Sequence, residues 1–187
     1  NSTNDSQTIS LRYLSPQIVP FNENFEGGLN KWQIYNYDND RTWQLHSGTG
    51  CSAFNGNTAL KMDNYGYDDT GELDGLFVRI DMNNYLQTFL TFNIAYASHS
   101  SQGADRLRVV LSSDCGQSFV TLYDKFGDNL ATTGGTSGAF VPSLCTHWRT
   151  ETVSLQDYAD SEIVLGFINQ SGADNPVYID NVGVNGT

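Results

Sequence analysis

The sequence predicts an all-β protein built as a two-sheet antiparallel sandwich. Short apolar runs alternate with clusters of Gly, Asn and Asp, and almost no segment places apolar residues at helical spacing. Hydrophobic residues make up 39% of the 187 residues, including 10 Phe, 10 Tyr and 3 Trp, which supplies enough apolar surface for one buried core. We therefore expect a single folded domain of short strands.

Ten runs are rich in β-branched and aromatic residues and are bounded by turn residues, as strands are. They cover residues 32–37, 42–46, 59–64, 76–81, 87–96, 106–112, 119–124, 148–154, 162–170 and 177–184. LRVVLS alternates most clearly, and FLTFNIAYA is apolar enough for a central strand buried on both faces. SSDCGQSF has the residues of a tight hairpin, 127–141 form a long loop rich in Gly and Thr, and 155–158 suggest one helical turn.

The chain divides near its N-terminal side. Residues 1–18 are interpreted as a linker or the tail of a preceding domain, because they are polar and because Pro16 and Pro20 interrupt any strand pairing. Residues 19–187 form the sandwich module. No apolar run reaches the roughly 18 residues that span a membrane, and the N-terminus lacks signal-peptide features, so we expect a mature or excised piece without membrane insertion.

The charge balance restricts the partners. The chain has 9 Lys and Arg against 21 Asp and Glu, a net charge of -12, and no basic stripe that could neutralise a phosphate backbone. Nucleic acid is therefore excluded as a partner. The excess acids either keep the surface soluble or converge in part on bound cations that cancel them.

Three cysteines allow one disulfide. Their spacings match no zinc site, and we favour Cys115 with Cys145, because both lie near predicted strand ends. Closing that loop of about 30 residues would stabilise the fold by about 3 kcal/mol. The alternative is three reduced thiols packed as small hydrophobic groups.

Motifs for catalysis are weak, and we expect no enzyme activity. The histidines form no HExxH pair, no GxSxG elbow occurs, and a Ser-His-Asp triad assembled in space stays open. The carboxylate pairs Asp68-Asp69 and Glu72-Asp74 have the chemistry for glycoside hydrolysis, but their Gly-rich context also explains them as turn residues.

The segment YNYDNDRTW is a candidate calcium loop. Asp38 and Asp40 flank Asn39, and calcium takes about 6 to 8 oxygen ligands from such side chains and from backbone carbonyls. The segment lacks the glycine and terminal Glu of an EF-hand. The alternative is a plain turn closed by Asp and Asn side chains.

Three stretches of the sequence together resemble a known family. PFNENFEGGLNKWQIYNYDNDRTWQL is similar to the opening of the MAM-like jelly rolls related to cleaved adhesins, also called choice-of-anchor J domains, of large secreted Bacteroidota proteins. LTFNIAYASHSSQGADRLRVVLSSDCGQSFVTLYDKFGDNLAT resembles their central strands, and FVPSLCTHWRTETVSL and VYIDNVGV resemble their closing strands. The resemblance covers residues 19–185 and implies an antiparallel jelly-roll sandwich.

The resemblance also implies a setting and a metal site. Such domains follow a catalytic domain, often a metalloprotease, or repeat within adhesins, which implies a secreted or cell-surface protein. It implies that Glu26 and Asp180 jointly hold calcium. Asp180 stands in an otherwise apolar strand, where an unpaired carboxylate is costly to bury. The alternative is that Asp180 only caps a loop through hydrogen bonds.

Two departures from the family pattern bear on function. Cys51 and Cys145 have no place in it, and Tyr37 stands where relatives tend to have Pro. Tyr37, with Tyr65 and Tyr67, could form an aromatic platform for a sugar ring, whereas Trp32 and Trp43 match core positions.

We therefore predict a non-catalytic, calcium-stabilised binding module, monomeric in isolation, that recognises a glycan or a cell-surface protein. The alternatives are a structural spacer or protein-interaction domain beside a catalytic domain and, less favoured, a hydrolase.

Overall fold

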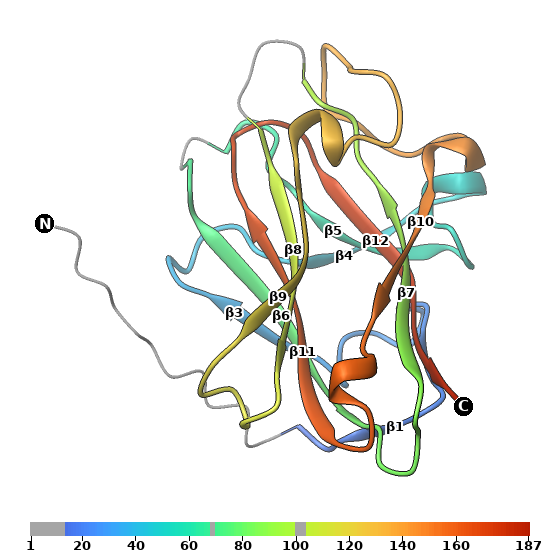
Figure 1. The fold of residues 1–187 in the computed structure, drawn as a ribbon. Coiled ribbons are helices and arrows are strands. Elements are labelled where there is room, and N and C mark those ends of the chain that lie inside the picture. Colours follow the sequence, from blue (N-terminus) through green and yellow to red (C-terminus); the bar gives the residue numbers. More distant parts are fainter. Residues whose placement is uncertain (1–13, 68–69, 100–103) are drawn as a thin grey trace, which may run out of the picture.

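The computed structural model describes residues 14–67, 70–99 and 104–187, which fold into two six-stranded sheets (Figure 1). The first sheet has the order β1-β6-β11-β8-β9, with β3 also paired to β6. Its strands are β1 Gln17–Ile18, β3 Gln33–Asn36, β6 Leu73–Asp81, β8 Arg106–Ser112, β9 Val120–Phe126 and β11 Glu162–Gln170.

The second sheet has the order β10-β7-β12-β5-β4, with β2 also paired to β12. Its strands are β2 Phe21–Glu23, β4 Gln44–Ser47, β5 Thr58–Met62, β7 Thr88–Ala95, β10 Arg149–Ser154 and β12 Val177–Gly186. Single 3-10 turns form at η1 Gly50–Ser52, η2 Gly127–Asn129, η3 Cys145–His147 and η4 Gln156–Tyr158. The predicted all-β, two-sheet architecture is confirmed.

Each of the ten predicted runs overlaps a strand, and the predicted bounds of 106–112 and 162–170 coincide with β8 and β11. The sequence analysis missed β1 and β2. These strands have only two and three residues, too few to show a period of two. β1 pairs in parallel with β6 from within the predicted linker, and the first 13 residues of that linker lie outside the described part of the chain.

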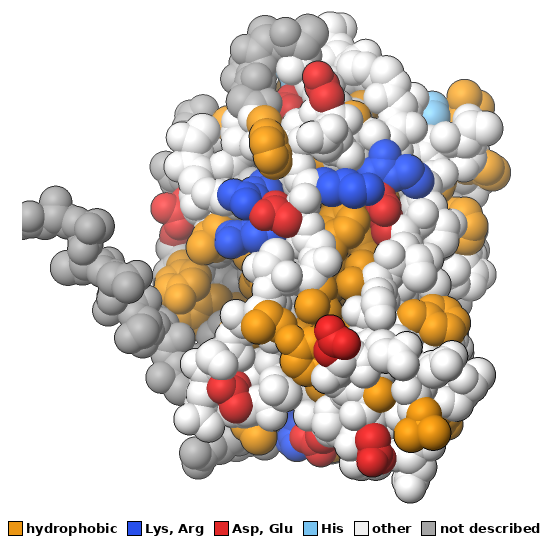
Figure 2. Space-filling model, viewed as in Figure 1, with side chains coloured by type: hydrophobic (Ala, Val, Ile, Leu, Met, Phe, Trp, Pro, Cys, Tyr) orange, Lys and Arg blue, Asp and Glu red, His pale blue; other side chains and the backbone are white. Residues whose placement is uncertain are grey.

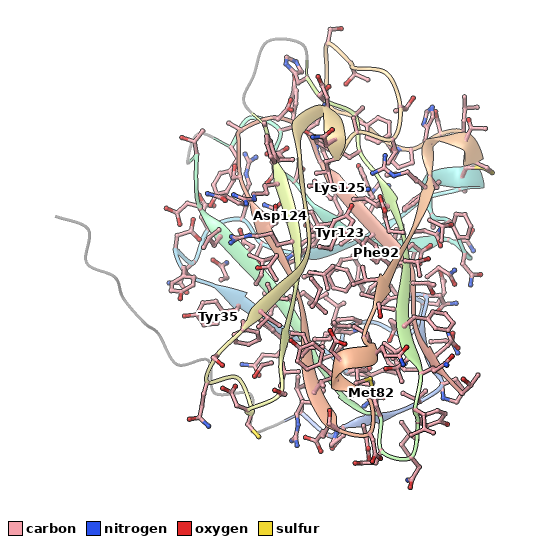
Figure 3. All side chains as sticks on the ribbon, in the orientation of Figure 1. Tyr35, Met82, Phe92, Tyr123, Asp124 and Lys125 are labelled. Atoms are coloured by element: carbon pink, nitrogen blue, oxygen red, sulfur yellow. A yellow bond between two sulfur atoms is a disulfide. The ribbon has the colours of Figure 1, made fainter. Side chains whose placement is uncertain are left out.

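The core lies between the sheets and is built by alternation. On β7 the side chains of Leu90, Phe92 and Ile94 face the interior and are fully buried. Phe92 meets Phe167 of β11 with ring centroids 5.2 Å apart and Tyr123 of β9 at 5.5 Å, so both sheets contribute to one aromatic cluster (Figure 3). Burial of each such side chain stabilises the fold by about 1.5–3 kcal/mol.

The two sheets meet at one edge, where β9 contacts β10. Glu151 of β10 accepts bonds from Lys125 of β9 at 2.8 Å and from Arg149 at 2.7 Å, and the Tyr123 hydroxyl donates to it at 3.2 Å. Because several donors share one half-buried carboxylate, this network holds the edge strands together better than isolated surface ion pairs do.

The disulfide differs from the prediction. Cys51 pairs with Cys145, with Cα atoms 5.0 Å apart, and Cys115 is free and exposed. The prediction of Cys115 with Cys145 is wrong because the hairpin between β8 and β9 carries Cys115 away from η3, whereas the fold brings η1 beside η3. The indole N–H of Trp148 donates to the Cys51 carbonyl at 2.9 Å and supports that contact. No helix in the described ranges is long and apolar enough to cross a membrane.

Candidate functional site

The outer face of the first sheet collects residues from five strands into one row. The strand register aligns Tyr35 of β3, Gly75 of β6, Ile168 of β11, Arg108 of β8 and Asp124 of β9. All five point away from the core, since their neighbours along each strand face inward. Figure 3 labels Tyr35 on β3 and Asp124 on β9, the strands at the two ends of this row. Segments far apart in the sequence thus build a common surface.

Two glycines on this face make room for an aromatic floor. A Cβ added at Gly75 would meet Phe77 Cε2 at 2.5 Å, and one added at Gly166 would meet Phe77 Cε1 at 2.5 Å. The ring of Phe77 therefore lies over both glycines, close to the backbone. With Val110 and Val164 it forms a small buried cluster outside the main core. The functional consequence is a smooth apolar surface where an ordinary sheet would present alternating side chains.

A groove of about 190 Å³ lies above this floor. Its lining residues are Tyr35, Tyr37, Leu73, Gly75, Phe77, Arg108, Val110, Phe119 and Ile168. The Tyr35 and Tyr37 rings meet edge to face with centroids 4.3 Å apart, and Phe119 packs on Phe77 at 5.5 Å. Tyr37 is 42% exposed, so its ring is available to a ligand. The groove has an apolar floor, aromatic walls and one charged group.

Glu26 and Asp180 meet the same loop on the other sheet. Asp180, in β12, is fully buried, and its Oδ2 accepts bonds from the N–H groups of Phe54 at 2.8 Å and Asn55 at 2.7 Å. Glu26, just after β2, accepts bonds through Oε1 from the N–H groups of Asn57 at 2.7 Å and Thr58 at 2.5 Å. β2 pairs with β12, so the first and last strands of the second sheet are neighbours.

Burial and the nearby carboxylate of Glu26 both disfavour the ionised form of Asp180. Burial, opposed by the backbone N–H groups and assisted by the charge of Glu26, raises the pKa of Asp180 to about 6. No group of three His, Cys, Asp or Glu side chains with the arrangement of a metal site occurs within the described ranges. A cation here would therefore need loop carbonyl or Asn oxygens besides the two carboxylates. The hydrogen bonds expected of a loop-capping Asp180 are also present.

Comparisons with known proteins address the fold. No family model and no curated protein matches the chain. The K1 cleaved adhesin domain of Lys-gingipain from Porphyromonas gingivalis W83 aligns with a TM-score of 0.64 at 18% identity, over 89% of this chain and 98% of that chain. The chain therefore has the jelly-roll fold of that domain. This result confirms the predicted fold class.

Carbohydrate-binding modules share this jelly roll. Module CBM27-1 of Caldicellulosiruptor saccharolyticus, solved in complex with mannohexaose, aligns with a TM-score of 0.58 at 14% identity, over 89% of this chain and 96% of that chain. TmCBM61, solved in complex with β-1,4-galactotriose, aligns at 0.59 and 14% identity, over 88% and 95%. At these identities the likeness shows the fold alone.

The three tyrosines of the predicted aromatic platform do not lie together in the fold. Tyr37 lines the groove, while Tyr65 is exposed elsewhere and packs against His99 with ring centroids 5.7 Å apart. Tyr67 is only 3% exposed, because its hydroxyl donates to Asp38 and its ring lies in the core, so it presents no face to a ligand. Trp32 and Trp43 are buried, as predicted.

The Asp38-Asp40 segment forms the turn named as the alternative to a calcium loop. Asp38 Oδ1 accepts the N–H of Asp40 at 3.0 Å, and Asn36 Oδ1 accepts that of Asn39 at 3.0 Å. Asp74 lies close enough for the charge of Asp38 to act on it, and burial first of all raises the pKa of Asp74 to about 6. Whether this cluster also holds calcium stays a prediction.

Two histidines and one carboxylate considered for catalysis make structural contacts. His46 packs edge-on against Tyr178 at 5.2 Å, and His147 accepts the N–H of Ser143 through Nδ1 at 3.3 Å. Asp74 is buried under Trp43, whose indole N–H donates to its carbonyl at 3.1 Å. The pair at 68–69 lies outside the described residues.

Sequence reasoning missed Tyr35, Phe119 and Arg108 as groove residues. A signal was present in Gly75 and Gly166, because a glycine inside a strand marks a place where another group approaches the backbone closely. The glycines alone do not show which side chain approaches the backbone, because that depends on the register of the strands.

Proposed function

We propose that this jelly roll is a non-catalytic binding module that holds a saccharide in the groove on the outer face of the first sheet. The observation that carries this proposal is the aromatic lining, Tyr35, Tyr37 and Phe119 over the Phe77 floor. Aromatic faces pack on the C–H groups of sugar rings, and ligand sites are typically concave and mostly apolar with few polar groups. The saccharide-bound modules with the same fold support this use.

A polysaccharide panel tests the proposal. The chain is run by affinity electrophoresis through gels containing neutral and acidic polysaccharides, together with Tyr37→Ala and Phe119→Ala. The matched control is Phe89→Ala, which removes an aromatic that is 40% exposed on the second sheet. We expect retardation by at least one polysaccharide, weakened about tenfold or more by each groove variant and unchanged by the control. Retardation of no gel, or equal retardation of all variants, contradicts the proposal.

Recognition of a protein surface is the second candidate. Phe54 packs against Trp148 with ring centroids 6.3 Å apart, and Val141 and Leu144, also exposed, lie close in sequence to the disulfide. Exposed apolar groups of this kind suit a partner protein. A chain that ignores every polysaccharide but binds a cell-surface protein, and loses that binding in Phe54→Ala, would favour this function.

Export and calcium complete the proposal. The Cys51–Cys145 bond supports a secreted or cell-surface location, because disulfides persist in oxidising compartments. Glu26 and Asp180 would hold the calcium ion with oxygens of the loop 54–58, and Asp38 and Asp40 are a second candidate pair. Calcium would supply positive charge to two carboxylates that approach the same loop.

Thermal unfolding in calcium and in excess chelator tests the metal site. Binding to the folded state stabilises it by about 2.7 kcal/mol at a hundred times Kd, so chelator should lower the melting temperature by several degrees. Glu26→Gln and Asp180→Asn should abolish the difference, while Glu162→Gln on the other sheet should keep it. Identical melts of the unmodified chain in both conditions rule the site out.

A further inference from the structure

We infer that the groove selects an acidic saccharide, whose carboxylate or sulfate oxygens pair with the guanidinium of Arg108. The inference rests on the proposed function, since it names the class of saccharide that the same groove binds. It follows from the guanidinium of Arg108, which is unpaired within the described ranges, from the charge of the groove lining and from a second cavity near this residue.

Arg108 is the charged residue of the groove lining, and it makes no hydrogen bond or ion pair with the rest of the described chain. Its Nε is buried without a partner. The nearest carboxylate across the register, Asp124, is occupied by Arg106, which donates to both of its oxygens, through Nε at 2.6 Å and through Nη2. The N–H donors of Arg108 therefore remain unpaired in the described part of the chain, because Arg106 occupies the carboxylate of Asp124.

A half-buried guanidinium without a partner is costly, which indicates that a ligand supplies one. Burial, and then the positive charge of Arg106, lower the pKa of Arg108. A planar guanidinium forms two parallel bonds to a carboxylate or a sulfate, shorter and stronger than neutral bonds. The aromatic walls place a sugar ring beside that fork, so the groove has a partner for the ring and a partner for its acidic group.

The charge of the groove lining differs from the charge of the whole molecule. The net charge is -12, yet no Asp or Glu of the described ranges lines the groove. On the side seen in Figure 2, Lys and Arg side chains gather in two groups around acidic side chains, with hydrophobic surface beside them. A protein this acidic repels polyanions at long range, so any polyanion that it retains is held by a specific contact.

A second cavity lies next to Arg106 of β8. It has a volume of about 260 Å³, and Arg106, Phe126 and Gln170 line it. Arg106 and Arg108 point to the same face of β8 and lie two residues, about 7 Å, apart. A saccharide long enough to reach this cavity from the groove would meet the Phe126 ring and the Gln170 amide there.

The test compares Arg108→Gln with Arg79→Gln. Both variants remove one positive charge from the same face, but Arg79 is paired with Glu162 and lines neither cavity. The probes are polygalacturonate, the same polymer with its carboxyl groups reduced to alcohols, dextran sulfate and dextran, each titrated by calorimetry. Near-ultraviolet circular dichroism and melting temperature confirm that each variant is folded.

The expected result is binding of polygalacturonate but not of its reduced form, weakened at least about tenfold in Arg108→Gln and less than about twofold in Arg79→Gln. The same pattern with dextran sulfate and not with polygalacturonate identifies sulfate as the source of the oxyanion. Equal affinity for acidic and neutral polymers, lost in Tyr37→Ala but kept in Arg108→Gln, overturns the inference and leaves the proposed function standing. Binding of no polymer overturns both.

Discussion

Removing the disulfide should cost more stability than its solvent-exposed position suggests. Cys51 and Cys145 are 94 residues apart, and they tie η1, between β4 and β5, to η3, just before β10. Neither cysteine is part of the core. The stabilisation therefore comes mainly from the unfolded chain, which the bond restrains.

The magnitude follows from the loop that the bond closes. The chain-entropy relation gives about 4.7 kcal/mol for a loop of about 95 residues. The double variant Cys51→Ala/Cys145→Ala should thus lose between about 3 and 5 kcal/mol of unfolding free energy. The larger figure is a substantial part of the typical stability of a domain, about 5–15 kcal/mol.

Urea unfolding followed by tryptophan fluorescence measures the loss, with Cys115→Ser as the control that should change stability by less than about 0.5 kcal/mol. Alkylation of the unreduced, unfolded chain followed by peptide mapping should label Cys115 alone. Label on Cys51 or Cys145, or a double variant within about 1 kcal/mol of the unmodified protein, would refute the reasoning.

Two further predictions test the floor of the groove and a buried carboxylate. Gly166→Ala places a Cβ 2.5 Å from Phe77 and 3.0 Å from Val110. It should therefore lower the free energy of unfolding in urea by about 1–3 kcal/mol and weaken saccharide binding. Unchanged stability and binding would contradict the close packing of Phe77 on this glycine. Burial above all raises the pKa of Asp105 from 3.8 to about 6, so its contribution to stability is complete below about pH 4 and is lost as the pH rises through 6, by up to about 3 kcal/mol. Asp105→Asn should flatten that part of the urea-stability profile between pH 4 and 7.5, and an equal slope in both proteins would contradict the assignment.

The fold could be predicted where burial imposes a period on the sequence. Residues 106–112 and 162–170 alternate because one face of each strand packs on the second sheet, and their predicted bounds coincide with those of β8 and β11. β1 and β2 carry no such signal. Pro16 and Pro20 predict that this segment does not pair, yet β1, between them, pairs with β6, and β2, directly after Pro20, pairs with β12.

The site was less predictable, because it depends on register and not on local pattern. Tyr37 was identified as an aromatic at an unusual position, but Tyr35, Arg108 and Phe119 join it only through the alignment of distant strands. Tyr67 illustrates the opposite error. It stands in a polar, Gly-containing segment typical of an exposed loop, yet its hydrogen bond to Asp38 holds it against the core.

Calcium and protons should compete for Asp180. Its pKa of about 6 lies above the ordinary 3.8, so without metal the folded state binds a proton more tightly than the unfolded state, and stability falls as the pH rises from about 4 through 6. Calcium binds the ionised carboxylate, so the ion should raise the melting temperature more at pH 7 than at pH 5. Asp180→Asn should remove this difference. An equal gain at both pH values, or none at either, would leave the N–H groups of Phe54, Asn55 and Asn181 as the only partners of that carboxylate.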